Sequence, residues 1–286
     1  MTLNVLVTGA NSGLGLLTVQ TFAEAGHAVR ATLRNPQKAQ ALNALKERGL
    51  AVEILPLDVT DPDSIAAAVE AAGPIDVLVN NAGFEVRGPI EQLTDELLQR
   101  QFDTNVLGVA RMVRAVAPQM RERGEGTIVN VSSVAGQIAS PYTGAYSASK
   151  HAVEALSEAL WFELRPFGVR VVIIEPGGFE TAFGANVLTT PGFDETSPYA
   201  PVAARFDAAM AGFRSGPPQD PQEVADLILA AALAPDPKLR HLAGNDARML
   251  VPLYRGMEFE GFAGAMLNQL GLADVVAAPG AAETGG

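Results

Sequence analysis

The regular alternation of short apolar runs with longer helix-forming segments constrains the fold of this chain more than any other feature. The runs are apolar throughout and not only at every second residue, which is typical of strands buried on both faces of a parallel sheet. The segments between them are rich in Ala, Leu and Glu and have the length of helices. This order predicts an α/β fold built on a doubly wound parallel sheet. The six predicted strands cover residues 3–8, 28–33, 51–57, 76–80, 126–132 and 169–175.

The alternation ends after Glu175. Residues 176–220 are rich in Pro, Gly, Thr and Phe and have the pattern of one short helix near 200–214. A long insertion beside a ligand site is commonly functional. We therefore predict a substrate lid at about 180–220.

The C-terminal part returns to regular elements. The pattern predicts a helix at 221–234, a short strand at 241–244 and a helical segment at about 245–270. Because no linker or repeat divides the chain, we predict a single domain over residues 1–275. The small and polar residues 276–286 are expected to form a disordered tail.

Composition narrows the classes of function. A formal charge of -12 among 286 residues argues against nucleic acid or an anionic membrane as partner. The absence of cysteine excludes disulfides, thiolate metal sites and cysteine nucleophiles. His27, His151 and His241 lack metal-ligand spacing, so no metal site is expected. With no apparent signal peptide and no apolar stretch long enough to span a bilayer, we expect a cytoplasmic protein.

A glycine-rich segment, Thr8–Gly15, follows the first predicted strand and opens the first helix. Glycines there permit a tight turn and let backbone N–H groups meet a pyrophosphate at the helix N-terminus, as in Rossmann-type folds. Such a cluster also occurs for packing alone, and its G-x3-G-x-G spacing departs from G-x-G-x-x-G, so it gains weight only in combination. The predicted cofactor contacts in it are Gly9, Asn11, Ser12, Gly13, Leu14 and Gly15.

Three residues form a candidate catalytic group. Tyr146 and Lys150 are four apart in a strong helical pattern and share one face, while Ser133 ends the fifth strand at the edge where ligands bind. A phenol has a pKa of about 10, and a cation one helical turn away would lower it. Ser133 could hydrogen-bond the reacting oxygen. A Tyr–Lys pair alone usually reflects packing, but with the glycine loop it indicates carbonyl/alcohol chemistry.

Residues 3 to 245 resemble a short-chain dehydrogenase/reductase. The motifs that carry the resemblance occur in order: TGANSGLG at 8–15, Asp58-Val59, Asn80-Asn81-Ala82-Gly83, Asn105, Ser133, YSASK at 146–150 and Pro176-Gly177.

The resemblance implies a role for each catalytic residue. Tyr146 would be the general acid in reduction and the base in oxidation. Lys150 would hold the nicotinamide ribose and lower the tyrosine pKa. Ser133 would orient the substrate oxygen, and Asn105 would hold a water of the proton relay. Further cofactor contacts are implied at Asp58, Val59, Asn81, Ala82, Gly83, Tyr146, Lys150, Pro176, Gly177 and Thr181.

The end of the second predicted strand bears on the choice of cofactor. An acidic residue there would bind both ribose hydroxyls of NAD and repel a 2′-phosphate, but the chain has Leu33. Arg34, the next residue, can bind a 2′-phosphate through charge-assisted hydrogen bonds, with Ser12 and Lys38 as further donors. The resemblance therefore implies NADP(H), with NAD(H) as the less favoured cofactor.

The substrate is less constrained. Aromatic residues of the lid, with Phe84, Val86, Ile138 and Tyr142, could form an apolar wall, although an apolar stripe is more often packing. We expect a hydrophobic ketone or aldehyde and its alcohol, as in steroid- or retinoid-converting members of the family. The alternatives are a 3-oxoacyl-thioester reductase and, from another class, a non-catalytic dinucleotide sensor. The resemblance also implies a homodimer or homotetramer formed through helices at about 95–122 and 145–167.

Overall fold

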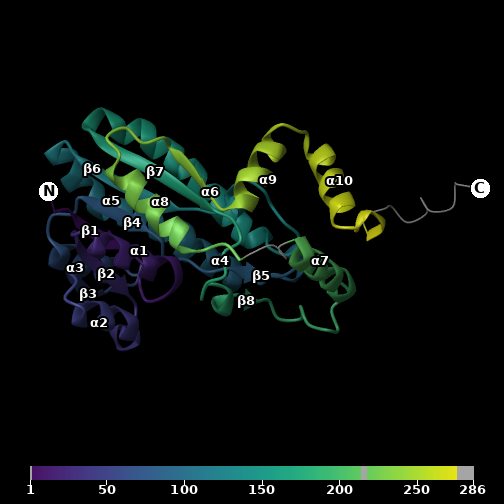
Figure 1. The fold of residues 1–286 in the computed structure, drawn as a ribbon. Helices are drawn as coiled ribbons and strands as arrows, with labels where there is room; N and C mark the ends of the chain where they lie inside the picture. Colours follow the sequence, from purple (N-terminus) through teal and green to yellow (C-terminus); the bar gives the residue numbers. More distant parts are fainter. Residues whose placement is uncertain (1, 214–217, 276–286) are drawn as a thin grey trace, which may run out of the picture.

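The computed structural model describes residues 2–213 and 218–275 and contains a seven-stranded parallel sheet covered by helices on both faces (Figure 1). The strand order is β3-β2-β1-β4-β6-β7-β9, and every neighbouring pair is parallel. This confirms the predicted doubly wound α/β fold. The strands are β1 (Asn4–Val7), β2 (Ala28–Leu33), β3 (Val52–Pro56), β4 (Val77–Asn80), β6 (Gly126–Val131), β7 (Val169–Pro176) and β9 (Arg240–Ala243).

Two apolar clusters hold the layers together, one on each face of the sheet. Phe22 of α1 and Ile228 of α8 pack with β1 and β2 on one face, and Met112 of α5 packs with Leu78 and Ile128 on the other. Each of these side chains is fully buried and contributes about 1.5–3 kcal/mol relative to exposure. The helices of the two layers are α1 (Gly13–Glu24), α2 (Gln40–Glu47), α3 (Pro62–Ala72), α4 (Asp95–Phe102), α5 (Gly108–Arg123), α6 (Gly144–Leu164) and α8 (Gln222–Leu233).

The central strands β1 and β4 position the ligand site. From β1 the chain proceeds outward to β2 and β3, and from β4 it proceeds in the other direction to β6, β7 and β9. The loops after β1 and β4 therefore diverge at the carboxyl edge of the sheet, and a crevice opens between them.

The long helix predicted at 95–122 is interrupted. It consists of α4, a π-helical turn at Asp103–Leu107 and α5. Such turns insert an extra residue into a helix and often occur at functional sites. Here the turn contains Asn105, and residue spacing alone gave no indication of it.

Of the C-terminal elements, α7 and α10 project at one end of the molecule in Figure 1, whereas α8 and β9 belong to the central layers. A small parallel pair, β5 (Val86–Arg87) and β8 (Leu188–Thr189), precedes α7 (Ala200–Phe213). The helical segment predicted at 245–270 is split into α9 (Asn245–Arg255) and α10 (Phe259–Gln269). The predicted tail 276–286 and residues 214–217 of the predicted lid lie outside the described residues. Within the described ranges, no helix is both long and apolar enough to cross a membrane.

Candidate active site

The glycine loop after β1 has the shape of an anion cradle. Gly9 and Gly13 have φ values of +67° and +54°, which favour glycine. A Cβ on Gly9 would lie 2.9 Å from the Ala82 Cα, and a Cβ on Gly15 would overlap the Gly9 carbonyl oxygen and lie 2.5 Å from Asn81 Nδ2. The glycines therefore allow the loop and the start of α1 to pack closely against the loop after β4. Within the described residues, Ser12 at the N-cap makes no capping hydrogen bond with its side chain, so its hydroxyl is available to an anion as well.

Thr8 and Asn81 join the glycine loop to the loop after β4. The backbone N–H groups of Asn81 and Ala82 both donate to Thr8 Oγ1 at 3.0 Å. Asn81 Nδ2 donates in turn to the carbonyl oxygens of Thr8, at 2.9 Å, and Gly9, at 3.1 Å. The predicted contacts Gly9, Asn81 and Ala82 are thus brought together by direct hydrogen bonds.

The residues predicted to contact the adenosine part of a dinucleotide cofactor lie at the ends of β2 and β3. Leu33 is buried, and Arg34 next to it is exposed at the carboxyl edge of the sheet. Asp58 accepts hydrogen bonds from the N–H and hydroxyl of Thr60, and Val59 is 7% exposed. An exposed guanidinium at this edge can turn toward a bound anion.

The loop after β7 closes the other side of the crevice. Pro176 ends β7, and the N–H of Gly178 donates to Asp246 Oδ2 at 2.7 Å. A side chain on Gly177 would overlap Asp246, so the loop requires glycine there. The loop then places Thr181 beside Gly13, where a Cβ on Gly13 would be 3.5 Å from Thr181 Cβ. Thr181 therefore lies over the start of α1.

Ser133, Tyr146 and Lys150 meet at the carboxyl edge of β6. Ser133 Oγ accepts the N–H of Ala135 at 3.1 Å and donates to the Pro176 carbonyl at 3.4 Å. Lys150 Nζ donates to the Val131 carbonyl at 2.8 Å and lies 5.7 Å from the centre of the Tyr146 ring. Both side chains on α6 are nearly buried, at 9% and 6% exposure. The convergence expected from their spacing is present.

Burial sets the charge states of this pair. It raises the pKa of Tyr146, with the Ser133 hydroxyl lowering it in part and Glu85 raising it further. Burial lowers the pKa of Lys150 to about 8, against the influence of Glu154. The sequence predicted that the nearby Lys150 ammonium would lower the pKa of Tyr146. In the structure, desolvation of the buried phenol is the larger effect, and this pKa is raised. Tyr146 is consequently a protonated phenol at neutral pH.

Asn105 is held by the loop that follows Gly83. Its Nδ2 donates to the Phe84 carbonyl at 3.0 Å and to Ser149 Oγ at 3.2 Å, and its Oδ1 accepts the N–H of Phe84. A Cβ on Gly83 would lie 3.2 Å from that Oδ1. The π-helical turn therefore ties Asn105 to both the cofactor loop and the catalytic helix.

Aromatic side chains of the predicted lid contact two tyrosines at the start of α6, Tyr142 and Tyr146. The Phe183 ring lies 5.8 Å from the Tyr146 ring. Tyr142 stacks on Phe193 at 5.2 Å and meets Tyr199 edge-on at 6.3 Å. Its left-handed φ of 64°, rare for a residue other than glycine, belongs to the turn that precedes α6. Val86 is fully buried and is not part of an apolar wall.

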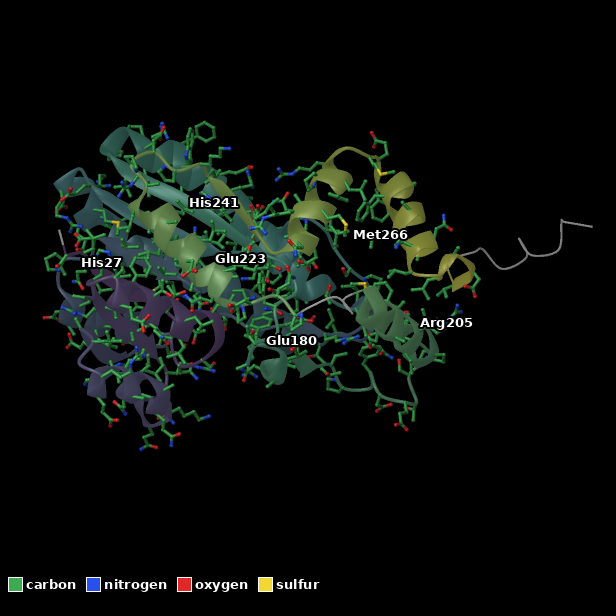
Figure 2. All side chains as sticks on the ribbon, in the orientation of Figure 1. His27, Glu180, Arg205, Glu223, His241 and Met266 are labelled. Carbon is green, nitrogen blue, oxygen red and sulfur yellow. The ribbon has the colours of Figure 1, made fainter. Side chains whose placement is uncertain are left out.

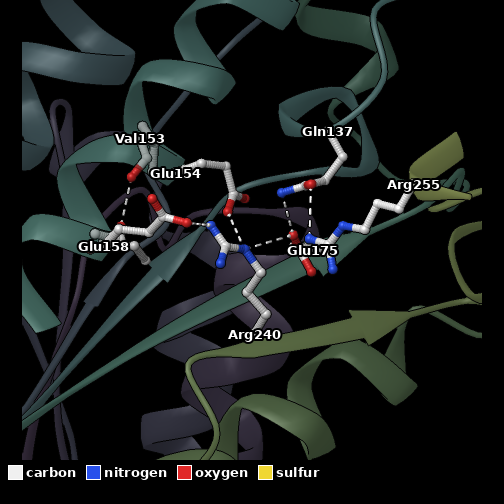
Figure 3. A network of polar contacts seen from close by, with 9 residues as sticks. Gln137, Val153, Glu154, Glu158, Glu175, Arg240 and Arg255 are labelled. Atoms are coloured by element: carbon white, nitrogen blue, oxygen red, sulfur yellow. Dashed lines mark hydrogen bonds and ion pairs between the residues drawn. The ribbon is translucent and has the colours of Figure 1, made fainter. Parts of the chain in front are cut away.

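A partly buried charge network between α6, β7 and β9 was not predicted from the sequence (Figure 3). Arg240 of β9 contacts Glu154 at 3.0 Å, Glu158 at 2.7 Å and Glu175 at 3.5 Å. Glu175, near the end of β7, is 1% exposed, so its carboxylate is buried beside Arg240. The position of Glu154, four residues after Lys150, was the available signal. Arg240 gave none.

The histidines are far from one another. Figure 2 shows His27 and His241 on different parts of the molecule. Among the described residues, no group of three or more His, Asp or Glu side chains is arranged to hold a metal ion.

Comparison with known proteins gives a consistent result. Residues 3–191 match the sequence model of the short chain dehydrogenase family. The 3-ketodihydrosphingosine reductase of Bacteroides thetaiotaomicron is 44% identical over 186 residues, which are 64% of this chain and 66% of that protein. The human 17-beta-hydroxysteroid dehydrogenase type 1 is 38% identical over 266 residues, covering 88% of this chain and 79% of that protein.

Solved structures agree with these relatives. A short-chain dehydrogenase from Streptomyces avermitilis superposes with a TM-score of 0.78 at 35% identity, over 93% of this chain and 97% of the other. A short-chain dehydrogenase/reductase from Burkholderia phymatum, in complex with NAD, has a TM-score of 0.76 at 29% identity over 88% and 92% of the chains. A single-residue variant of the actinorhodin polyketide ketoreductase, with NADPH, has a TM-score of 0.73 at 31% identity over 86% and 97%.

Proposed function

Because the chain belongs to the short-chain dehydrogenase/reductase family of nicotinamide-dependent oxidoreductases, we propose that it interconverts a hydrophobic ketone or aldehyde and its alcohol with NADP(H). The observation that carries this proposal is the convergence of Ser133, Tyr146 and Lys150 beside the glycine loop.

The residues at the crevice fit a dinucleotide. The loop has no room for a side chain at Gly9 or Gly15 and takes a left-handed φ at Gly13. α1 begins there, and the first N–H groups of a helix can bind a pyrophosphate. Asp58, Val59, Asn81 and Gly83 would border the adenosine, and Thr181 with Pro176 and Gly177 would hold the nicotinamide end. When bound, the nicotinamide supplies or accepts the hydride.

The catalytic group handles the proton. In reduction, Tyr146 donates its phenolic proton to the substrate oxygen, while Ser133 donates a hydrogen bond to that oxygen. The Lys150 ammonium stabilises the phenolate that results, and Asn105 holds the water that returns a proton. Tyr146 carries its proton near neutral pH, as reduction requires, and the Lys150 ammonium would offset part of the rise that burial causes in its pKa.

We propose a preference for NADP(H) on account of Leu33 and Arg34. The buried Leu33 offers no carboxylate to the ribose, and the exposed Arg34 can pair with a 2′-phosphate. A charge-assisted hydrogen bond of about 1.5–3 kcal/mol corresponds to roughly a ten- to hundredfold preference.

A hydrophobic substrate is supported by the aromatic surroundings of Tyr146. Phe183 borders the phenol, and Phe193 and Tyr199 of the lid contact Tyr142 in the turn before α6. Relatives named for a ketodihydrosphingosine and a hydroxysteroid are consistent with a lipid-like ketone or alcohol.

We also propose a homodimer or homotetramer built on α4, α5 and α6. Apolar side chains project from these helices and their ends into solvent: Leu107, Leu156, Phe162 and Phe167 are 49%, 36%, 72% and 47% exposed. Leu156 and Phe162 lie on α6, Leu107 directly precedes α5 and Phe167 follows α6. Exposed apolar residues gathered on and beside α6 are typical of a subunit interface.

A substrate panel tests the proposed function. The purified protein is given NADPH or NADH with a steroid ketone, a long-chain ketone, a 3-oxoacyl thioester and a small polar ketone. We expect oxidation of NADPH with the highest kcat/KM for an apolar ketone. Cofactor binding without turnover of any ketone or aldehyde would instead support a dinucleotide sensor, and a clear preference for the thioester would support the acyl reductase.

A further inference from the structure

Lys150 is a buried cation whose direct partner is uncharged. Its ammonium donates to the Val131 carbonyl, and burial disfavours its charged form. The proposed chemistry nevertheless needs this charge, because a phenolate must be stabilised beside it. Another group has to favour the ammonium.

Glu154 occupies the position that can do this. It lies one helical turn after Lys150 on α6 and is 5% exposed, and its charge favours the protonated form of Lys150. Its Oε2 is held by Arg240 Nε at 3.0 Å. Its Oε1 and the Ser132 hydroxyl both lie against Gly136, where a Cβ would be 3.1 Å and 2.6 Å from them, and that hydroxyl lowers the pKa of Glu154 in part. The carboxylate is therefore directed into the protein.

Other charged groups around the pair come from several elements. Tyr146 and Glu158 share α6 with Lys150 and Glu154, and Arg240 reaches them from β9. Glu175 of β7 contacts Arg240 from the opposite side at 3.5 Å. Glu175 in turn accepts from Gln137 at 2.9 Å, and Arg255 of α9 donates to Gln137. Figure 3 shows Glu154, Glu158 and Glu175 around the Arg240 guanidinium, with Gln137 and Arg255 beside Glu175. Charges of alternating sign thus run from Lys150 through Glu154 to Arg240.

We propose that Glu154, oriented by Arg240, is a positioning residue that keeps Lys150 protonated while Tyr146 exchanges its proton with the substrate. Burial favours protonation of Glu154, and Arg240 opposes it. Arg240 thereby preserves the negative charge of Glu154 that acts on Lys150. The catalytic consequence rests on the proposed function, whereas the effect on the charge of Lys150 does not.

The chain offers a direct measurement because it has four lysines, Lys38, Lys46, Lys150 and Lys238. Lysine labelled with 13C at Cε gives four NMR signals, and the Lys150→Arg variant identifies the signal of Lys150. In the unaltered protein this signal should titrate near pH 8. In Glu154→Gln the midpoint should fall by on the order of one pH unit.

Glu158→Gln is the matched control. Glu158 is on the same helix and pairs with the same guanidinium, but it is two turns from Lys150 and 54% exposed at its side chain. We expect no change in the titration midpoint of Lys150 for this variant. In Glu154→Asp, which keeps the carboxylate, the midpoint should lie close to that of the unaltered protein. If Glu154→Gln does not fold, Glu154→Met removes the buried polar group altogether and repeats the test.

The pH profile of ketone reduction gives the second readout. Reduction requires the ammonium, so its rate should fall as pH rises through the Lys150 midpoint, and Glu154→Gln should move that fall to lower pH by the same amount. One pH unit above the midpoint, the rate should be about tenfold lower. A folded Glu154→Gln whose Lys150 titrates as in the unaltered protein overturns the proposal. If no ketone is reduced, the proposed function fails, but the NMR titration still decides the role of Glu154.

Discussion

Replacing Glu175 by glutamine should stabilise the protein, and more so as pH rises. Glu175 is 1% exposed. Burial and the neighbouring Glu154 raise its pKa to about 7, although Arg240, Arg255 and Gln137 each lower this pKa in part. The folded chain therefore binds this proton more tightly than the unfolded chain. The contribution to stability is fully present below about pH 4.5 and is lost as pH rises through about 7.

The size of the effect follows from the two pKa values. Each pH unit between 4.5 and about 7 is worth about 1.4 kcal/mol, which sets a ceiling of about 3 kcal/mol. Relaxation of the network reduces it, so we expect roughly 2 kcal/mol at pH 8 and roughly 0.5 kcal/mol at pH 5. The amide oxygen of a glutamine can still accept from Gln137, and the hydrogen bond of 2.9 Å is retained.

Urea unfolding at pH 5, 6, 7 and 8 measures the difference. The fluorescence of the single tryptophan, Trp161, and circular dichroism report unfolding at one fixed protein concentration. Glu158→Gln, which removes an exposed carboxylate from the same guanidinium, should show a small difference that is the same at every pH. A Glu175→Gln difference that does not grow with pH would refute the reasoning.

Three further predictions concern cofactor, loop and assembly. Leu33→Asp combined with Arg34→Ala should lower the NADPH/NADH ratio of kcat/KM by roughly ten- to hundredfold, and an unchanged ratio would exclude a role for this edge in selectivity. Gly15→Ala places a methyl group against the Gly9 carbonyl and Asn81, so calorimetry should find weaker NADPH binding and unfolding should show a loss of about 1–3 kcal/mol; wild-type affinity would contradict the cradle. Phe162→Glu, at a side chain 72% exposed, should shift the oligomer toward monomer in light scattering, and an unaffected mass would place the interface elsewhere.

The sheet was predictable because its strands are short, apolar and buried on both faces. Each of the six predicted strands agrees with the structure within one or two residues, and the strand expected at 241–244 corresponds to β9. The predicted helix at 221–234 is likewise α8. The π-helical turn around Asn105 was not predicted, because no residue type in it marks such a turn. The break after Arg255 was also not predicted, although Gly256 at the C-cap of α9 was an available signal.

The candidate site also has some features that the sequence predicted and others that it did not. Tyr146 and Lys150 are brought together by one helical turn, and the motif order placed Ser133 at the same edge, so local spacing predicted their convergence. Arg240 reaches Glu154 across 86 positions of sequence, and such a contact has no local pattern. The direction of the Tyr146 pKa was predicted wrongly for the chain by itself, because the sequence indicated the neighbouring cation but not the depth of burial.

The most direct test of the proposed mechanism is a single-turnover measurement on Tyr146→Phe. With excess protein, NADPH absorbance is followed after mixing with the best ketone of the panel, and NADPH affinity is measured in parallel. We predict NADPH binding within about twofold of the unaltered protein and hydride transfer slowed by about a hundred- to ten-thousandfold, since the proton donor is removed from a site that otherwise remains intact. Transfer within about tenfold of the unaltered rate would contradict the assignment of Tyr146 as the general acid.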